Sequence, residues 1–294
     1  MVGLGGSSKS YLSIYLAAER TFASEGLSVD VVTFDGGSRA AAALTAGSVD
    51  LALASLDTVI GVLRSDHPVR AFYGGFNHAD LEWYALPTVR SWGDMRGRRL
   101  AISAYGSLTD FLTQHVLRKH GLGSDQPVHL TPTGGPSIRW QALRAARVDA
   151  AILPSPQKWH ARTEGFTRLG SQADDVAPDW PTNVIFARED FLAKHPRTVH
   201  AFLRAHVRAI RLARSDREAG ITALMKWLKY ERADAERAHE EGIAGLDERG
   251  RLPARAMLVF WEVARAAGDV TEPWPDSRFL DRRFIDSFAQ WAPQ

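Results

Sequence analysis

Hydrophobic and polar residues in the first third of the chain alternate between the period of a strand and the period of a helix. Apolar or alternating runs that predict strands cover Val2–Gly5, Leu27–Phe34, Val49–Ala54 and Val69–Tyr73. Helical spacing of apolar residues covers Tyr11–Ser24, Arg39–Ala46 and Asp57–Arg64. Strands joined by short helices predict βαβ units and a mostly parallel sheet.

The same order of elements returns from about residue 92. Strands are predicted at Arg99–Ser103 and Val128–Leu130, and helices at Leu108–His120 and Ile138–Arg147. The segment GGSRAAAALTAGSVDLALA at 36–54 is echoed by GGPSIRWQALRAARVDAAIL at 134–153. Two copies of a Gly-Gly turn, an Ala-rich helix and a Val-Asp strand indicate two related lobes rather than a solenoid.

The chain must then cross between these lobes twice. Two short β-prone segments, Glu82–Pro87 and Thr182–Ala187, are suited to be hinge strands. We therefore expect an α/β fold in which lobe 1 comprises residues 1–86 and 187–294 and lobe 2 comprises residues 87–186, with a ligand cleft between them. Helical periodicity dominates the chain from about Glu189 onward, so the C-terminal region should consist of helices that pack around the lobes.

Composition narrows the possible chemistry. The chain has 294 residues, no cysteine and a net charge of +2, with acidic and basic residues interleaved. Thiol nucleophiles, zinc–thiolate sites and disulfides are therefore excluded, and no basic stripe points to nucleic acid. No apolar run reaches the roughly 18 residues of a membrane span, and no signal peptide precedes the first strand. We expect an exported protein whose leader is missing from this sequence; a leaderless cytoplasmic protein is the alternative.

Several segments together resemble a known family. They are LAAERTFASEGLSVDVV at 16–32, the Gly-Gly segment at 36–55, SWGDMRGRRLAIS at 91–103 with GSLTDFL at 106–112, the run at 187–209, and DSRFLDRRFIDSF at 276–288. In order and spacing they resemble the nitrate, sulfonate, taurine and thiamine-precursor branch of periplasmic substrate-binding proteins. The resemblance implies a type II bilobed fold, and a solute-binding component of an ABC importer with a permease and an ATPase as partners. It implies no catalytic residue, no metal and no cofactor, a monomer, and a periplasmic location, with a lipid-anchored extracellular form as the alternative.

The candidate ligand residues lie where predicted strands end and helices begin. In α/β folds ligands bind at this edge, where the free N–H groups and the positive dipole end of a helix can hold an anion. Helix caps and ordinary packing are the alternative explanation for each position taken alone. The predicted ligand-binding residues are Ser8, Lys9, Tyr11, Gly37, Ser38, Ser55, Asn77, Tyr105, Ser107, Thr109, Gly135, Ser155 and Trp180.

The charged residues near this edge do not identify the ligand. Lys9, Arg39 and Arg139 are candidate cations for an anion, and a solvated surface position is the alternative for each. Asn77 and His78 follow a predicted Gly74-Gly75 turn, which could face the cleft or be exposed. We expect a small organic anion, a sulfonate or carboxylate with an aromatic or alkyl part as an option. A neutral pyrimidine-like ligand is the alternative.

An enzyme on the same fold is the main rival function, because the resemblance extends to desulfinase-like, decarboxylase-like and thiamine-precursor enzymes. The sequence contains no G-x-S-x-G elbow and no H-E-x-x-H pair. His195, His200 and His206 do not share a helix face, and we expect all three at the surface. A transcription-factor effector domain is a further rival, but no helix-turn-helix precedes the first strand.

Overall fold

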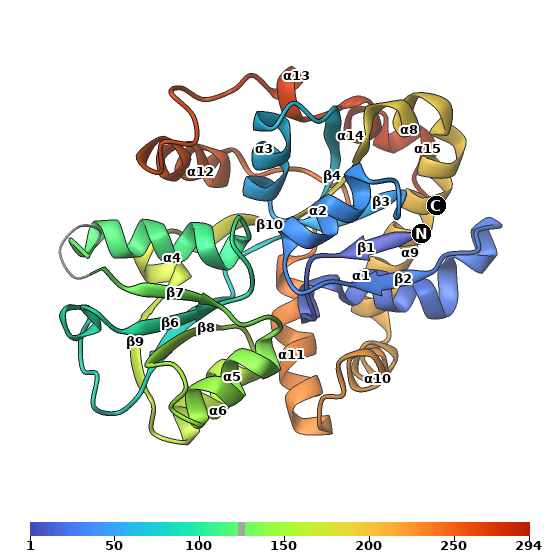
Figure 1. The fold of residues 1–294 in the computed structure, drawn as a ribbon. Coiled ribbons are helices and arrows are strands. Elements are labelled where there is room, and N and C mark those ends of the chain that lie inside the picture. Colours follow the sequence, from blue (N-terminus) through green and yellow to red (C-terminus); the bar gives the residue numbers. More distant parts are fainter. Residues whose placement is uncertain (123–126) are drawn as a thin grey trace.

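Two five-stranded sheets organise the molecule in the computed structural model, which describes residues 1–122 and 127–294 (Figure 1). The first sheet has the order β2-β1-β3-β10-β4. Its strands are β1 Val2–Leu4, β2 Val31–Thr33, β3 Leu51–Ala54, β4 Val69–His78 and β10 Asp179–Arg188. Strands β1, β2 and β3 are parallel, as predicted, and β10 runs antiparallel between β3 and β4.

The second sheet repeats this arrangement. Its order is β7-β6-β8-β5-β9, with β6, β7 and β8 parallel and β5 antiparallel between β8 and β9. Its strands are β5 Glu82–Ala85, β6 Arg99–Ile102, β7 His129–Pro132, β8 Ala150–Leu153 and β9 Thr167–Ser171. The repeated sequence at 36–54 and 134–153 thus corresponds to a repeated topology, because each copy supplies the helix and the third parallel strand of one sheet.

The two predicted hinge strands lie inside the sheets. Strand β5 is an inner strand of the second sheet and β10 an inner strand of the first, and the last three residues of β5 are buried. Apolar side chains on both faces fit such an inner position rather than an exposed hinge. The chain instead passes between the sheets at 79–81 and 172–178. We therefore propose that lobe 1, built on the first sheet, and lobe 2, built on the second, meet at these two crossing segments.

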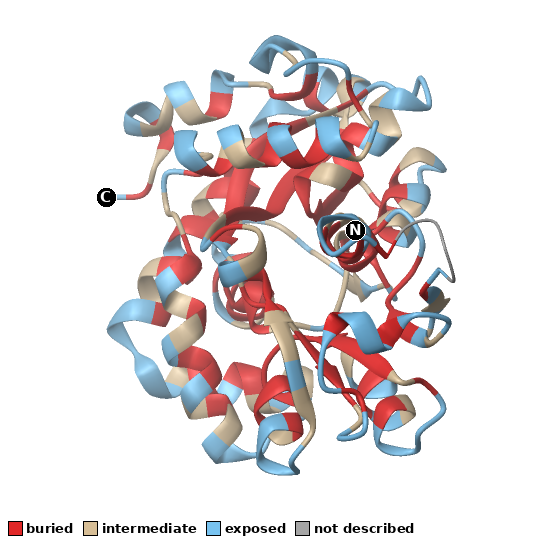
Figure 2. Ribbon diagram, turned by 90° about the vertical axis from the view of Figure 1, so that its left-hand side faces the viewer, coloured by how far each residue is buried: buried red, intermediate tan, exposed pale blue. Residues whose placement is uncertain are grey.

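Helices cover both faces of each sheet, and buried residues gather in the strands and on the inward helix faces (Figure 2). In lobe 1 the predicted first helix at 11–24 is divided into shorter turns, and a left-handed Gly26 ends it. The helical segments before the C-terminal region are η1 Lys9–Tyr11, α1 Leu12–Leu16, η2 Ala17–Thr21, η3 Ala23–Glu25, α2 Gly37–Thr45, α3 Leu56–Arg64, η4 Trp92–Met95, α4 Leu108–Lys119, α5 Pro136–Arg144, α6 Gln157–Thr163 and α7 Gln172–Asp175.

The C-terminal region is helical, as the periodicity predicts. It comprises α8 Glu189–Lys194, α9 Pro196–Ser215, α10 Arg217–Leu228, α11 Arg232–Gly245, α12 Ala254–Ala266, α13 Asp276–Phe279, α14 Arg283–Asp286 and α15 Phe288–Trp291. Helix α9 packs against α1, and α12 packs against β10. These helices therefore enlarge the core of lobe 1. No helix in the described part of the chain is long and apolar enough to cross a membrane.

One of the three histidines expected at the surface is in the core. His195 is exposed and His200 is half-buried, but His206 on α9 is fully buried beside Tyr73 and Phe202. Neither ring nitrogen of His206 has a hydrogen-bond partner. Burial disfavours the imidazolium and lowers the pKa of His206 from 6.5 to about 4.

We expect His206→Leu to weaken the pH dependence of stability on the acid side. The unfolded chain binds a proton at this histidine below pH 6.5 and the folded protein does not until about pH 4, so folding loses stability as the pH falls through this window. At pH 5 the contribution of His206 to this loss should be roughly 2 kcal/mol, and the variant should lack that contribution. Urea unfolding at pH 7.5 and pH 5 measures it, with His195→Leu as the exposed control. An unchanged pH slope in His206→Leu would contradict the assignment.

Candidate ligand site between the lobes

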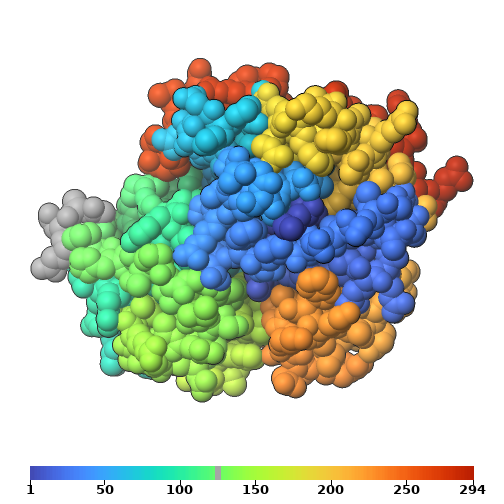
Figure 3. All heavy atoms as spheres, turned by 45° about the vertical axis from the view of Figure 1, so that its right-hand side comes forward, coloured from blue at the N-terminus to red at the C-terminus, as the bar shows by residue number. Residues whose placement is uncertain are grey.

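A cavity lies between the two lobes at the carboxyl ends of their parallel strands. The space between the lining residues is about 700 Å³ when the open solvent at its mouth is included. Figure 3 shows the blue surface of lobe 1 in contact with the green surface of lobe 2 along the seam that closes over it. Lobe 1 contributes the ends of β1 and β3 and the starts of η1, α2 and α3; lobe 2 contributes the ends of β6 and β8 and the starts of α4 and α5.

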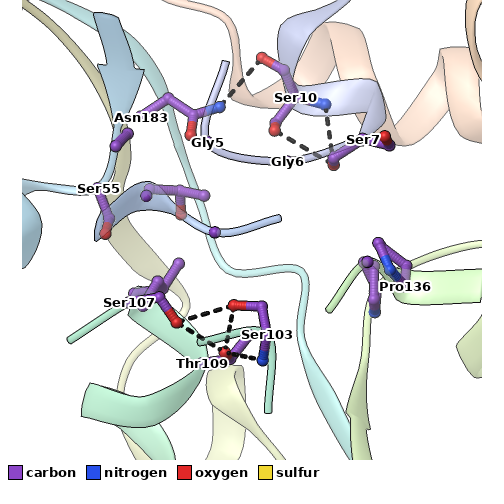
Figure 4. Close-up of a pocket in the computed structure, with 18 of the residues that line it drawn as sticks. Gly5, Gly6, Ser7, Ser10, Ser55, Ser103, Ser107, Thr109, Pro136 and Asn183 are labelled. Atoms are coloured by element: carbon purple, nitrogen blue, oxygen red, sulfur yellow. Dashed lines mark hydrogen bonds between the residues drawn. The ribbon is translucent and has the colours of Figure 1, made fainter. Parts of the chain in front are cut away.

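The lobe 1 wall of the cavity consists mainly of residues with small polar side chains or none. Gly5, Gly6, Ser7, Ser8 and Ser10 line it in the turn after β1. This turn sits very close to α2, because a Cβ on Gly5 would lie 2.9 Å from the Cα of Gly37. Such spacing leaves backbone N–H groups near the cavity, where a larger residue would cover them. Asn183 on β10 closes this wall and donates from Nδ2 to the Ser10 carbonyl, at 3.3 Å (Figure 4).

The lobe 2 wall carries a cluster of three hydroxyl groups. Ser103 Oγ lies 2.8 Å from both Ser107 Oγ and Thr109 Oγ1, and the last two are 3.0 Å apart. Figure 4 shows this cluster opposite Ser10 and Gly6, across the cavity. All three residues are buried and line the cavity. The Ser107 hydroxyl donates to the Ala104 carbonyl at 2.6 Å, and the hydroxyls can rotate their protons toward a ligand acceptor, so the cluster can bind oxygen atoms without a fixed charge of its own.

Four helices begin at the cavity: α2, α3, α4 and α5. The N-cap residues of α3 and α4 are Ser55 and Ser107, and neither side chain caps its helix. Ser8, in contrast, does accept a hydrogen bond from the Ser10 N–H. The first N–H groups of a helix have no acceptor within the helix, and they carry its positive dipole end. The hydroxyls of Ser55 and Ser107 are thus not used as ordinary caps, and the helix starts add positive potential to the cavity.

Arg139 is the buried cation of the cavity wall. Its side chain is 3% exposed and lines the cavity from the second turn of α5. Nε donates to the Ile152 carbonyl at 2.8 Å and Nη1 to the Gly134 carbonyl at 2.6 Å. Among the described residues no carboxylate oxygen lies within 4.0 Å of this guanidinium. Burial lowers the pKa of Arg139 to about 10, with Asp35 acting in the opposite direction, so the group stays charged at neutral pH.

The lobes are in contact around the cavity. Gly36, with φ of +122°, approaches lobe 2 so closely that a Cβ there would lie 3.1 Å from the Ala104 Cβ. Ser38 Oγ donates to the Tyr105 carbonyl at 2.9 Å, which links the start of α2 to lobe 2. The conformation is therefore a closed one, in which both walls face a shared small space.

The structure brings about half of the predicted ligand residues to the cavity. Those that line it are Ser8, Tyr11, Gly37, Ser55, Ser107, Thr109 and Gly135. Tyr11 is buried, and burial raises the pKa of its phenol well above the usual range, so it remains neutral. The rule that ligands gather at strand ends and helix starts predicts these positions.

Six predicted ligand residues lie elsewhere. Ser38 and Tyr105 contact each other across the rim, and the Tyr105 hydroxyl donates to the Leu130 carbonyl. Trp180 is fully buried among Phe111 and Phe260. The remaining three are Lys9, Ser155 and Asn77.

Asn77 was predicted to follow a turn, and that turn does not exist. Gly74, Gly75 and Asn77 all belong to strand β4. The glycines are there because residues 250–251 approach the strand: the Gly74 N–H donates to the Gly250 carbonyl, and a Cβ on Gly74 would lie 2.8 Å from the Arg251 oxygen. Asn77 Nδ2 donates to the same Arg251 carbonyl at 2.7 Å, so its amide secures this loop.

Lys9 and Ser155 belong to a buried ion network behind the cavity. Asp80, in the first crossing segment, accepts from Lys9 of lobe 1 at 2.5 Å and from Lys158 of lobe 2 at 2.9 Å. Burial alone would raise the pKa of Asp80, but the two ammonium groups hold it below its usual value. Burial opposes the charge of Lys158, yet Asp80 and Glu241 raise its pKa. Lys9 is therefore neither a solvated charge nor a cavity residue.

The network does not form a nucleophile. Lys9 Nζ donates to Ser155 Oγ at 2.6 Å, a pairing found in some serine hydrolases. Ser155, however, is fully buried and does not line the cavity, and its hydroxyl also reaches Asp80 and Glu241. Lys9 Nζ is also engaged by the Asp80 carboxylate, and neither Lys9 nor Ser155 lines the cavity where a ligand would lie.

Sequence reasoning missed several cavity residues. Ser103 could have been predicted, because it is the polar residue at the end of strand β6. No strand-end or helix-start pattern marks Asp80 and Asn183, because they lie in or beside the crossing segments. Arg139 is one of the predicted candidate cations, with a surface position as the alternative, and helical periodicity cannot show that α5 turns this position inward. The lining residues not among those predicted are Gly5, Gly6, Ser7, Ser10, Phe34, Asp35, Gly36, Ala54, Asp80, Leu81, Ser103, Leu108, Pro136, Pro154, Thr182 and Asn183.

Solved structures with this fold include binding proteins and an enzyme. A protein from Bordetella bronchiseptica RB50 is 22% identical, with a TM-score of 0.83 over 98% of this chain and 96% of that one. The alkanesulfonate-binding protein SsuA from Xanthomonas axonopodis pv. citri, bound to MOPS, is 17% identical, with a TM-score of 0.73 over 96% and 97%. The desulfurization enzyme DszB is 15% identical, with a TM-score of 0.67 over 99% and 98%. These similarities confirm the predicted periplasmic-binding-protein fold.

The sequence itself matches one family. No curated protein sequence matches the chain significantly. The profile of the NMT1/THI5-like family matches residues 9–219, which include both walls of the cavity except its first turn. The chain belongs to the NMT1/THI5-like family.

Proposed function

We propose that this protein is the solute-binding component of an ABC importer and that it captures a small organic anion between its lobes. The observation that carries the proposal is Arg139, a buried guanidinium with no carboxylate partner in the described part of the chain, at the wall of a cavity between two lobes. A buried charge without a counter-ion is costly, and an anionic ligand would supply the missing partner.

The other residues that line the cavity also favour an anionic ligand. Hydroxyls of Ser103, Ser107 and Thr109 and the starts of four helices can all donate to anionic oxygens. Phe34, Leu81 and Leu108 provide an apolar part of the lining that suits a short alkyl chain. Tyr11 and Phe34 are the aromatic residues in the lining.

The two acidic residues of the cavity lining differ in how they are paired. Asp80 is held by two lysines, whereas Asp35 is half-exposed with Arg39 at 3.7 Å. Asp80 is therefore not available to pair with an amine, but an exposed ion pair such as that of Asp35 is weak and leaves its carboxylate available. The lining therefore favours an anionic group beside Arg139 and leaves Asp35 as a contact for another part of the ligand.

Closure of the lobes supplies the mechanism. A ligand that contacts Arg139 and the hydroxyl cluster on lobe 2 and the Gly-Ser turn on lobe 1 stabilises the closed form over the open one. A permease and an ATPase are the proposed partners, and a periplasmic, monomeric protein is the form in which this mechanism would operate. The SsuA structure with the same fold is that of an alkanesulfonate-binding protein, which is consistent with this role.

An enzyme remains the second candidate because DszB shares the fold. Among the described residues, none of the serines that line the cavity is hydrogen-bonded to a histidine or lysine that could activate it, and the lysine-bonded Ser155 does not line the cavity. We infer binding without chemistry. Incubating the protein with a bound anion and analysing the recovered molecule by mass spectrometry tests this, and a changed molecule would favour the enzyme.

Replacing Arg139 should abolish anion binding. We expect a thermal-shift screen with methanesulfonate, MOPS, nitrate and acetate to find at least one stabilising anion for the native protein. In Arg139→Gln its affinity should fall at least about 30-fold, because truncating one side of a buried charge pair costs roughly 2 kcal/mol or more. Isothermal titration calorimetry measures the change.

The control for this experiment is Arg139→Lys, which keeps the charge and should retain part of the binding. Circular dichroism must show that both variants are folded, since Gln leaves one backbone carbonyl without its donor. Equal affinity of Arg139→Gln and native protein for the best anion would remove Arg139 from the site. Stabilisation by cytosine but by no anion would instead establish the neutral-ligand alternative.

Removing the Ser107 hydroxyl should have a smaller effect. We expect Ser107→Ala to weaken binding of the same anion about 10-fold, since a hydrogen bond to a charged group contributes roughly 1.5–3 kcal/mol. The melting temperature without ligand should also fall, because the buried hydroxyl bonds to Ser103, Thr109 and the Ala104 carbonyl. Ser171→Ala is the contrasting variant: Ser171 caps α7 at a distance from the cavity, so it should lower stability and leave affinity unchanged. An unchanged affinity in Ser107→Ala would show that Ser107 is structural only.

A further inference from the structure

Helix α11 is anchored on lobe 1 by its C-terminal half. Gly245 packs directly on the Phe76 ring of strand β4, where any Cβ would clash. Gly242 lies against Leu12, and His239 Nε2 contacts the Ala213 carbonyl of α9 at 2.8 Å. These contacts are buried and join α11 to the sheet and helices of lobe 1. The position of α11 is therefore fixed with respect to that lobe.

The N-terminal half of α11 reaches lobe 2. Asp234 Oδ2 is 2.8 Å from His160 Nε2 on α6. The Arg237 guanidinium lies over the Trp159 ring, 4.1 Å from its centroid. Just before the helix, the Tyr230 hydroxyl donates to the Ser155 carbonyl at 3.0 Å. Figure 3 shows the orange surface of this region against the light-green surface of lobe 2.

Helix α11 also contacts lobe 2 through the buried ion network. Glu241 of α11 accepts from Ser155 Oγ at 2.9 Å and lies 3.6 Å from the Lys158 ammonium of α6. It also lies 3.2 Å from Lys9 of lobe 1. One carboxylate of α11 therefore neutralises cations from both lobes. Since α6 moves with lobe 2 and α11 with lobe 1, a rotation that opens the lobes must change these distances.

We propose that α11 is a clasp that holds lobe 2 in the closed position through Tyr230, Asp234 and Arg237, and that its strength sets how readily the cavity opens. None of these three side chains lines the cavity, so the clasp acts on the lobe equilibrium and not on the ligand directly. This inference depends on the proposed function at one point: opening of the lobes is what releases the ligand. A weaker clasp raises the open fraction, and the ligand then binds less tightly and leaves faster.

The absence of cysteine from the chain permits a direct test. Ala42 on α2 and Gln141 on α5 are exposed residues on opposite lobes, so Ala42→Cys and Gln141→Cys provide one spin-label pair across the cleft. Double electron–electron resonance then gives the interlobe distance distribution without any ligand. This readout does not depend on the ligand's identity, so it can fail or succeed independently of the anion screen.

The clasp variant is Asp234→Asn with Arg237→Gln, and the matched control is Glu240→Gln with Arg217→Gln. Glu240 also lies on α11, but it pairs with Arg217 of α10 at 3.0 Å, within lobe 1. Both double variants remove one carboxylate and one guanidinium; the clasp variant removes two contacts with α6 of lobe 2, and the control removes one ion pair within lobe 1. Tyr230→Phe is a third variant that removes a single oxygen atom and carries little risk of unfolding.

We expect the clasp variant to shift the label distances toward longer values, with a several-fold rise in the ratio of open to closed form. Tyr230→Phe should shift them in the same direction by less, and the control should match the native protein. If methanesulfonate binds, its release from the clasp variant in stopped flow should be several-fold faster. Identical distance distributions for the native protein, the clasp variant and Tyr230→Phe would overturn the proposal. So would an equal shift in the control.

Discussion

The arrangement of the molecule depends on one buried carboxylate. Asp80 sits where the chain first crosses between the sheets, and it is held by Lys9 from lobe 1 and Lys158 from lobe 2. Taking such a charge out of water is costly, and it is tolerated only because both lysines and Glu241 bring the cluster to neutrality. The geometry that satisfies Asp80 therefore requires both lobes to be near their closed positions. The crossing segment, the cavity wall and helix α11 all meet at this cluster.

The buried ion network and the cavity wall differ in whether their charged groups are paired. Behind the cavity, two lysines and two carboxylates neutralise each other. On the cavity wall, Arg139 is held only by backbone carbonyls, which orient the guanidinium without cancelling its charge. In the described part of the chain no carboxylate lies within ion-pair distance of Arg139, and Asp35 acts on it only from farther away, which supports the proposal of an anionic ligand. The hydroxyl cluster adds donors but no charge, so it can adapt to the number and spacing of anionic oxygens.

The repeat of topology explains why the site lies between the lobes. Each sheet has three parallel strands whose carboxyl ends point toward the other lobe, and each contributes helix starts at that edge. The segments at 79–81 and 172–178 connect the sheets and lead into the inner antiparallel strands β5 and β10, so a displacement of either lobe must be absorbed at these two crossings. The fold is shared by binding proteins and by an enzyme, and the side chains at the cavity decide between these functions.

The sequence alone determined the α/β fold, the two repeats and the helical C-terminal region, because alternating periods and Gly-punctuated turns are local properties of the chain. It also indicated Ser55, Ser107, Thr109 and Gly135, since strand ends and helix starts can be recognised locally. Only the tertiary structure decided that Arg139 and His206 are buried, that Lys9 pairs with Asp80, and that Trp180 belongs to the core. The physical reason is that burial and charge pairing depend on residues such as Asp80 and Lys158, 78 positions apart, whose meeting no local pattern encodes.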